Sequence, residues 1–280
     1  MTPNLVLIAS YPKSGNTWVR LLLETVRRDA PVSINDIRNG LYGAPRRRLF
    51  DMIAPAEASE LLAEEIEELL PDFYASLADD GEAILKVHDR LRRTPSGRWL
   101  FPPECVKHVI YVVRHPFDVA VSYAHHRGIT IPAAVALLAN GDHVIAPYNP
   151  GAQLMLVERP STWSGNVASW LDGAPYPVTL VRYEDLFADP EPEIFRLAQA
   201  AELPASEAVV AKAIASTRFA RLQAEEAASG FWEGMPGNTA FFRQGRPGSW
   251  REVLDEASRQ TLLRDHGAMM ARLGYGTGAA

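Results

Sequence analysis

The sequence predicts an α/β fold in which helices cover both faces of a doubly wound parallel sheet. Two observations favour this class: short continuous apolar runs, as buried parallel strands require, and apolar residues at helical spacing between those runs. Strands that alternate with helices form right-handed βαβ units. A chain of 280 residues is within the range of one α/β unit with insertions, so we expect a single domain over residues 1–280.

The expected elements follow in chain order. Strands are predicted at 5–9, 83–85, 106–113 and 178–181, where short runs are continuously apolar. Helices are predicted at 17–28, 56–70, 117–125, 163–171, 193–201, 207–216 and 255–273. Stretches rich in Gly, Pro and aromatic residues are expected to form long loops over a functional site, at 94–103, 141–162 and 228–242.

Composition excludes several classes of protein. The net charge of −6 argues against a general nucleic-acid binder, whose affinity depends on Lys and Arg that neutralise phosphates. The single cysteine, Cys105, cannot form an intramolecular disulfide or a cysteine-rich metal site. The first residues lack the charged region of a signal peptide and the length of a spanning helix. We therefore expect a cytoplasmic protein without a membrane span.

The segment 11–18, Tyr-Pro-Lys-Ser-Gly-Asn-Thr-Trp, lies between the first predicted strand and the first predicted helix. At such a junction, backbone N–H groups and the positive end of the helix face one point, which favours a bound anion. Gly15 permits close backbone approach, Lys13 supplies a charge, and Ser14 and Thr17 supply hydroxyl donors. The segment is not a Walker A motif. An ordinary turn with a surface lysine is the alternative interpretation.

This octapeptide resembles the 5′-phosphosulfate loop of sulfotransferases that use 3′-phosphoadenosine 5′-phosphosulfate (PAPS), which usually reads YPKSGTTW. The resemblance implies donor contacts from Lys13, Ser14, Gly15, Asn16, Thr17 and Trp18, with Asn16 replacing a threonine. The segment 109–123 resembles the 3′-phosphate site of the same family. Arg114 at a strand end and Ser122 on the next helix could grip one phosphate, the arginine as a bidentate fork.

Two later segments extend the resemblance. The segment 241–250 is similar to the family's FxRKGxxGDW element, which implies donor contacts from Arg243, Gln244 and Gly245. Gln244 and Ser249 depart from the usual Lys and Asp, and we expect the lost lysine to loosen phosphate binding. The segment 182–186 is similar to a YEDL segment of the family.

A further group of expected donor contacts is aromatic or lies beside an aromatic residue. Thr217 and Phe219 match the family's T-x-F contact, and Tyr183 belongs to the YEDL segment. Trp18 and Phe219 would flank adenine, as aromatic faces can. Core packing remains an alternative role for Tyr183 and Phe219.

The segment 85–88, Leu-Lys-Val-His, resembles the family's KTH element and carries the expected catalytic residues Lys86 and His88. Histidine is the natural general base at neutral pH. A lone histidine is more often structural, but its occurrence with the other elements favours the catalytic role. Asp89 and Arg90 replace an apolar residue and a proline, so the sequence leaves this wall of the acceptor pocket open.

Together these matches cover residues 8–250 in the family's order. The resemblance implies a P-loop-like fold and transfer of a sulfo group from PAPS to a hydroxyl or amine of a small-molecule acceptor. His88 would be the base, Lys13 and Lys86 would neutralise developing charge, and Ser122 would hold Lys13 until the acceptor binds. Adenosine 3′,5′-bisphosphate leaves, and the family uses no metal.

Two alternatives stay open. A P-loop-type phosphotransferase or kinase could use the same phosphate loop, although Walker A is missing. A catalytically silent PAPS-binding protein is the other, although Lys13 and His88 are both present. The acceptor and the oligomeric state are not predicted, because the family's dimer segment is missing from 251–260. Aromatic residues in the expected loops suggest an apolar acceptor pocket or uncovered core: Trp99, Phe101, Tyr148, Phe231 and Trp232.

Overall fold

The computed structural model describes residues 3–38, 47–79, 83–146, 155–234 and 240–276. Within these ranges a four-stranded sheet has the order β2-β1-β3-β4, and every neighbouring pair is parallel. The strands are β1 (Leu5–Ser10), β2 (Ala83–Val87), β3 (Val106–Val113) and β4 (Val178–Arg182). Each predicted strand lies within an observed one, and the predicted α/β class with a doubly wound parallel sheet is confirmed.

The continuous apolar runs arise because both faces of the sheet are covered. In β1, Leu5, Leu7 and Ala9 belong to one buried cluster, whereas Val6 and Ile8 belong to another on the opposite face. Successive side chains of a strand point to opposite faces, so a strand buried on both sides must be apolar at every position.

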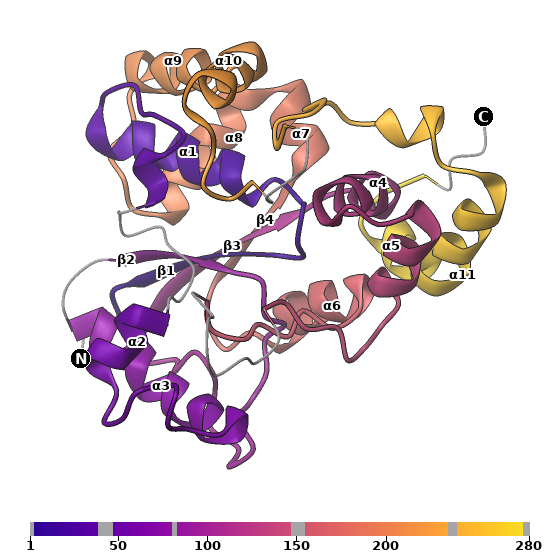
Figure 1. Ribbon diagram of the computed structural model, residues 1–280. Coiled ribbons are helices and arrows are strands. Elements are labelled where there is room, and N and C mark those ends of the chain that lie inside the picture. The colour runs from indigo at the N-terminus through magenta and orange to yellow at the C-terminus, as the bar shows by residue number, and fades with distance from the viewer. Residues whose placement is uncertain (1–2, 39–46, 80–82, 147–154, 235–239, 277–280) are drawn as a thin grey trace.

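Helices form a layer on each face (Figure 1). One face carries α1 (Asn16–Arg28), α7 (Tyr183–Ala188), α8 (Pro190–Ala200), α9 (Glu207–Ser216) and α10 (Phe219–Ser229). The other carries α2 (Arg47–Ile53), α3 (Ala63–Asp79), α4 (Pro116–Arg127), α5 (Ile131–Leu138), α6 (Trp163–Gly173) and α11 (Glu256–Arg272). Short 3₁₀ helices occupy Asp36–Arg38 and Ser249–Glu252.

One helix prediction was wrong in its position. The helix expected at 56–70 begins only at Ala63 and continues to Asp79, through Pro71. Its start is fixed by the Glu65 carboxylate, which accepts the Leu62 N–H at 2.8 Å, so the preceding residues form turns. The short helices α2, α5, α7 and α10 were not predicted. In the described ranges no helix combines the length and the apolar content that crossing a membrane requires.

Candidate active site

A cavity of about 890 Å³ opens at the carboxyl edge of the sheet. Because all strands run parallel, the residues that follow β2, β3 and β4 reach the same edge, where ligands of such sheets bind. His88, Arg114 and Tyr183 are those residues, and all three line the cavity. The segment 11–18, helix α4 and residues 240–245 enclose it from other sides.

The cavity lining contains nearly all residues that the sequence singled out. These are Lys13, Gly15, Asn16, Thr17, Trp18, Lys86, His88, Arg114, Ser122, Tyr183, Thr217, Phe219, Arg243, Gln244 and Gly245. Ser14 is not in the lining; its side chain is buried, and its hydroxyl has no hydrogen-bond partner among the described residues. Phe101 belongs to the buried core, Trp99 is partly buried against that core, Phe231 lines the cavity, and Tyr148 lies outside the described residues.

Gly15 is required by the close approach of Tyr183. Its φ is 107°, and a Cβ at this position would lie 2.6 Å from the Tyr183 ring. Asn16 starts α1 and donates from Nδ2 to the Ile8 carbonyl (2.8 Å) and to Ser10 Oγ (3.2 Å). The asparagine that replaces the family's threonine therefore ties the loop to β1.

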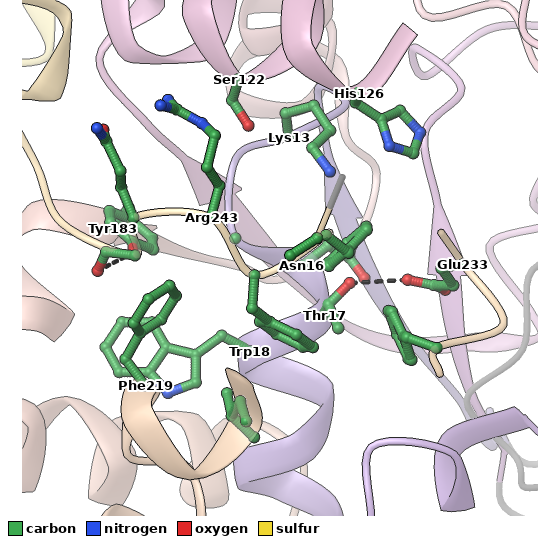
Figure 2. A pocket seen from close by; sticks show the side chains of 18 of the residues that line it. Lys13, Asn16, Thr17, Trp18, Ser122, His126, Tyr183, Phe219, Glu233 and Arg243 are labelled. Carbon is green, nitrogen blue, oxygen red and sulfur yellow. Dashed lines mark hydrogen bonds between the residues drawn. The ribbon is translucent and has the colours of Figure 1, made fainter. Parts of the chain in front are cut away.

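Lys13 points into the cavity, beside Ser122 and His126 of α4 (Figure 2). Its Nζ lies 3.8 Å from the centroid of the Phe241 ring. Burial lowers the pKa of Lys13 to about 7; the Glu233 charge opposes this shift, and the Lys86 charge adds to it. A bound anion would relieve this crowding of positive charge.

His88 is 8% exposed and its ring is fixed by β1. Nδ1 lies 2.9 Å from the Ser10 carbonyl oxygen, which can only accept a hydrogen bond. Nδ1 therefore carries the proton, and Nε2 is the basic nitrogen. Burial, followed by the Lys86 charge, lowers the pKa of His88 well below its usual value. The imidazole is therefore neutral at neutral pH, as a proton acceptor must be.

The residues after β2 form a reciprocal clamp with the segment 158–159. The His88 N–H donates to Glu158 Oε1 (2.7 Å), and the Arg159 N–H donates to Asp89 Oδ1 (2.8 Å). Asp89 is buried outside the cavity lining and also accepts from Arg92 Nε (3.2 Å). The unusual aspartate therefore holds the main chain of this wall and does not face an acceptor. Burial raises the pKa of Glu158, which lines the cavity, to about 7.

Arg114 lies at the other end of the cavity. Its guanidinium stacks 4.4 Å from the Tyr183 ring centroid, and Nη2 donates to the Arg246 carbonyl (3.1 Å). Its buried Nε has no hydrogen-bond partner among the described residues, and neither does Gln244 Oε1. Buried polar atoms of this kind usually have a partner, so both atoms fit a site built for a polar ligand.

Gly245 allows the segment 241–250 to approach this site. A Cβ at Gly245 would overlap the Phe219 ring, and its carbonyl accepts from the Tyr183 hydroxyl (2.9 Å). The Asp118 carboxylate, which the sequence analysis overlooked, accepts from Gly248 N (2.7 Å), Ser249 Oγ (3.0 Å) and Trp250 N (3.1 Å). Ser249, which stands where the family has an aspartate, thus donates to the carboxylate of Asp118. These hydrogen bonds hold the segment 248–250 against α4.

The residues expected around adenine come from α1, α7 and α10 and from the end of α9. Trp18 Nε1 donates to Thr217 Oγ1 (3.1 Å), and the Trp18 ring meets the Tyr183 ring edge-on at 5.5 Å. Phe219 begins α10 and is half-buried (Figure 2). Both Trp18 and Phe219 line the cavity, so both rings are placed to contact a bound ligand.

Glu233 was missed by the sequence analysis. Its carboxylate reaches the start of α1, where it accepts from Thr17 Oγ1 (2.8 Å) and Arg20 Nη2 (2.6 Å), and it also accepts from Lys86 Nζ (3.2 Å). His126, also missed, lines the cavity beside Lys13. Over the described part of the chain, no group of three His, Cys, Asp or Glu residues could hold a metal ion.

The chain matches known proteins over nearly its whole length. The family model described as "Sulfotransferase domain" matches residues 3–274. Sulfotransferase 1B1 of Canis lupus familiaris is 23% identical over 272 residues, which are 92% of this chain and 80% of the relative. Sulfotransferase 1A1 of Bos taurus is 25% identical over 277 residues, which are 96% of this chain and 84% of the relative.

Solved structures have the same fold. Retinol dehydratase in complex with retinol and PAP aligns with a TM-score of 0.62 at 21% identity, covering 96% of this chain and 82% of that protein. Mouse sulfotransferase SULT7A1 complexed with PAP aligns with a TM-score of 0.57 at 18% identity, covering 94% of this chain and 84% of that protein. These matches support the P-loop-like fold that the motifs implied.

Proposed function

Because the chain belongs to the sulfotransferase domain family and is a PAPS-dependent sulfotransferase, we propose that its cavity holds PAPS beside a small-molecule acceptor and that His88 is the general base. The observation that carries this proposal is the fixed tautomer of His88, a residue that lines the same cavity as Lys13 and Lys86. We also propose that residues 1–280 act as one domain and that the protein is cytoplasmic.

The donor fits the residues present at both ends of the cavity. We assign its 5′-phosphosulfate to Lys13, Thr17 and the backbone of 14–17 at the start of α1. Its 3′-phosphate would accept a hydrogen bond from Arg114 Nε, which has no partner among the described residues, and Ser122 and Arg243 would lie beside it. Trp18, Tyr183, Thr217 and Phe219 would surround adenine, and Gln244 and Gly245 would close the site. Ser14 would contribute its N–H only.

In the proposed reaction, an acceptor oxygen or nitrogen attacks the sulfur in line with the bond to the bridging oxygen. Nε2 of His88 removes the acceptor proton as the new bond to sulfur forms and the old one breaks. The ammonium groups of Lys13 and Lys86 stabilise the negative charge that grows on the leaving phosphate and the sulfonyl oxygens. Adenosine 3′,5′-bisphosphate (PAP) leaves, and the chain's residues supply this chemistry without a metal.

Part of the cavity lining is apolar. The lining includes Tyr123, Ile145, Met155, Phe231 and Phe241, which suits an acceptor with an apolar body. We propose a small-molecule acceptor, and the negative net charge speaks against a nucleic acid. A phosphotransferase and a silent PAPS-binding protein are the functions that the following experiment must separate from this one.

PAPS and PAP should raise the melting temperature more than adenosine 5′-phosphosulfate or ATP, because Arg114, Ser122 and Arg243 are assembled for a 3′-phosphate. Differential scanning fluorimetry with the four ligands measures this. Equal stabilisation by adenosine 5′-phosphosulfate would contradict the assignment of these residues, and preference for ATP with Mg²⁺ would indicate a kinase. Transfer of a sulfo group from PAPS to a simple phenol would exclude the silent protein.

Donor affinity should fall as the pH rises above about 7. The pKa of Lys13 is lowered to about 7 in the free protein, chiefly by burial, and a bound donor anion raises it. Below pH 7 Lys13 is charged in both states, whereas above it a proton must be taken up on binding. The Kd for PAP should then rise by up to about tenfold per pH unit.

Calorimetry at pH 8 in two buffers of different ionisation enthalpy measures this proton uptake. The uptake should disappear in Lys13→Met. Binding of PAP to the unsubstituted protein without proton uptake would show that Lys13 is already charged in the free state.

A further inference from the structure

The Glu233 side chain lines the cavity and points toward Thr17 at the start of α1 (Figure 2). Its carboxylate binds a hydroxyl and two cationic groups, at 2.8 Å from Thr17 Oγ1, 2.6 Å from Arg20 Nη2 and 3.2 Å from Lys86 Nζ. It is 7% exposed and therefore well sequestered from water. Glu233 thus connects the anion loop with one of the two lysines assigned to the reaction.

These partners are those of an anion site. Thr17 is in the first turn of α1, where the helix dipole and free N–H groups favour negative charge. Arg20 and Lys86 add two positive charges to the same point. The Glu233 carboxylate therefore occupies an anion-binding position whose partners are of the kind that phosphate or sulfonate oxygens use.

The carboxylate and the donor cannot use this site together. The Thr17 hydroxyl has one proton, which it donates to Glu233 while accepting from Arg20 Nη2 (3.1 Å). A second anion beside the carboxylate would also be repelled. Protonation does not remove the conflict. Burial alone would raise the pKa of Glu233, but the charges of Arg20 and Lys86 hold it well below its usual range.

Arg20 makes simple expulsion of the carboxylate costly. Its side chain is fully buried at the base of α1, with Glu233 as its ion-pair partner at 2.6 Å. Withdrawing the carboxylate takes this short ion pair away from a buried guanidinium, which is unfavourable. An anion that takes the place of the carboxylate restores a negative charge beside Arg20, and Arg20 Nη2 donates to Thr17 Oγ1 (3.1 Å), which faces that place.

We propose that the 5′-phosphosulfate of the donor exchanges with the Glu233 carboxylate, becoming the counter-ion of Thr17, Arg20 and Lys86, so that Arg20 is a further donor-binding charge. This inference rests on the proposed function. In the free protein, the Glu233 carboxylate holds Thr17, Arg20 and Lys86 together. It also weakens donor binding, because the donor must displace an internal competitor.

Glu233→Gln tests the exchange, because the amide retains the size of the side chain and removes its charge. The Kd for PAP should fall about tenfold or more, and the KM for PAPS should fall with it. Adenosine 3′-monophosphate lacks the 5′ anion, so its Kd should not change. Glu60→Gln, an exposed substitution outside the cavity, is the matched control and should bind both nucleotides like the unsubstituted protein.

A second measurement does not depend on the folding of that variant. Trp232 precedes Glu233, so PAP should change its fluorescence, measured as the difference between the unsubstituted protein and Trp232→Phe. Adenosine 3′-monophosphate should leave this difference signal unchanged.

Equal Kd values for PAP in Glu233→Gln and Glu60→Gln, or weaker binding in the first, would overturn the exchange and leave the proposed function intact. A Trp232 signal that does not respond to PAP would overturn it as well. If the unsubstituted protein does not bind PAP at all, the proposed function is wrong and the exchange fails with it.

Discussion

His88→Asn should lower turnover about 10²- to 10⁴-fold while leaving the Kd for PAP nearly unchanged, which is the loss expected for a positioned general base. The structure gives this residue the required tautomer, because the Ser10 carbonyl accepts from Nδ1 at 2.9 Å and leaves Nε2 basic. Asparagine can retain a hydrogen bond to Ser10 but cannot accept the acceptor's proton. Single-turnover kinetics and calorimetry with PAP measure the two quantities.

The His88 test has an internal gradient and a matched control. The loss should shrink for acidic phenols, which release their proton with less help, and grow for simple alcohols. His108→Asn is the control, because His108 lies on β3 outside the cavity and contacts Thr179 Oγ1 (2.8 Å). Near-normal turnover of His88→Asn on an alcohol acceptor would place the base elsewhere.

The strands could be predicted because a strand that is buried on both faces must be apolar at every position, and this shows in the local sequence. Each residue of β1 is buried on one face or the other, so the apolar run itself reports the environment. Helix α3 could not be placed in this way. Leu61 packs against the core from a turn, and Pro71 lies inside the helix, so the apolar pattern and the usual helix breaker both pointed to the wrong ends.

The site residues also differ in whether local sequence could reveal them. Lys13, His88 and Arg114 follow strands, and Lys86 lies near the end of β2. Parallel strands bring such residues to one edge whatever the rest of the chain does. Glu233 could not be found, because it is 213 positions from Arg20 and belongs to a loop without periodicity. A buried arginine at the start of α1 implies an acidic partner, but the sequence does not say which residue supplies it.

The family motifs do not show which contacts are made by the residues that depart from them. Ser249 and Asp89 were recognised as unusual, yet their roles depend on partners elsewhere. Ser249 donates to Asp118 on α4, and Asp89 accepts from the Arg159 backbone. In both places a hydrogen bond across the fold holds the main chain near the site, which motif comparison cannot reveal.

Arg114→Ala should weaken PAPS binding by about 2 to 5 kcal/mol, a loss of about 30- to 5,000-fold in Kd, because a desolvated 3′-phosphate would lose its charged partner. The guanidinium is held for this role by Tyr183 and by the Arg246 carbonyl, while its buried Nε has no described partner. The PAPS affinity of Arg114→Lys should lie between those of Arg114→Ala and the unsubstituted protein, because lysine keeps the charge but cannot form the planar fork.

The Arg114 effect should depend on the 3′-phosphate and on nothing else in the ligand. Adenosine 5′-phosphosulfate lacks this group, so its weaker affinity should be nearly the same in Arg114→Ala and in the unsubstituted protein. Arg246→Ala is the control within the same region, because its exposed side chain pairs with Glu252 and lies outside the cavity lining. Calorimetry with both ligands makes the comparison. A similar loss of affinity for both would mean that Arg114 supports the fold of the cavity, since only a direct contact distinguishes a ligand with the phosphate from one without it.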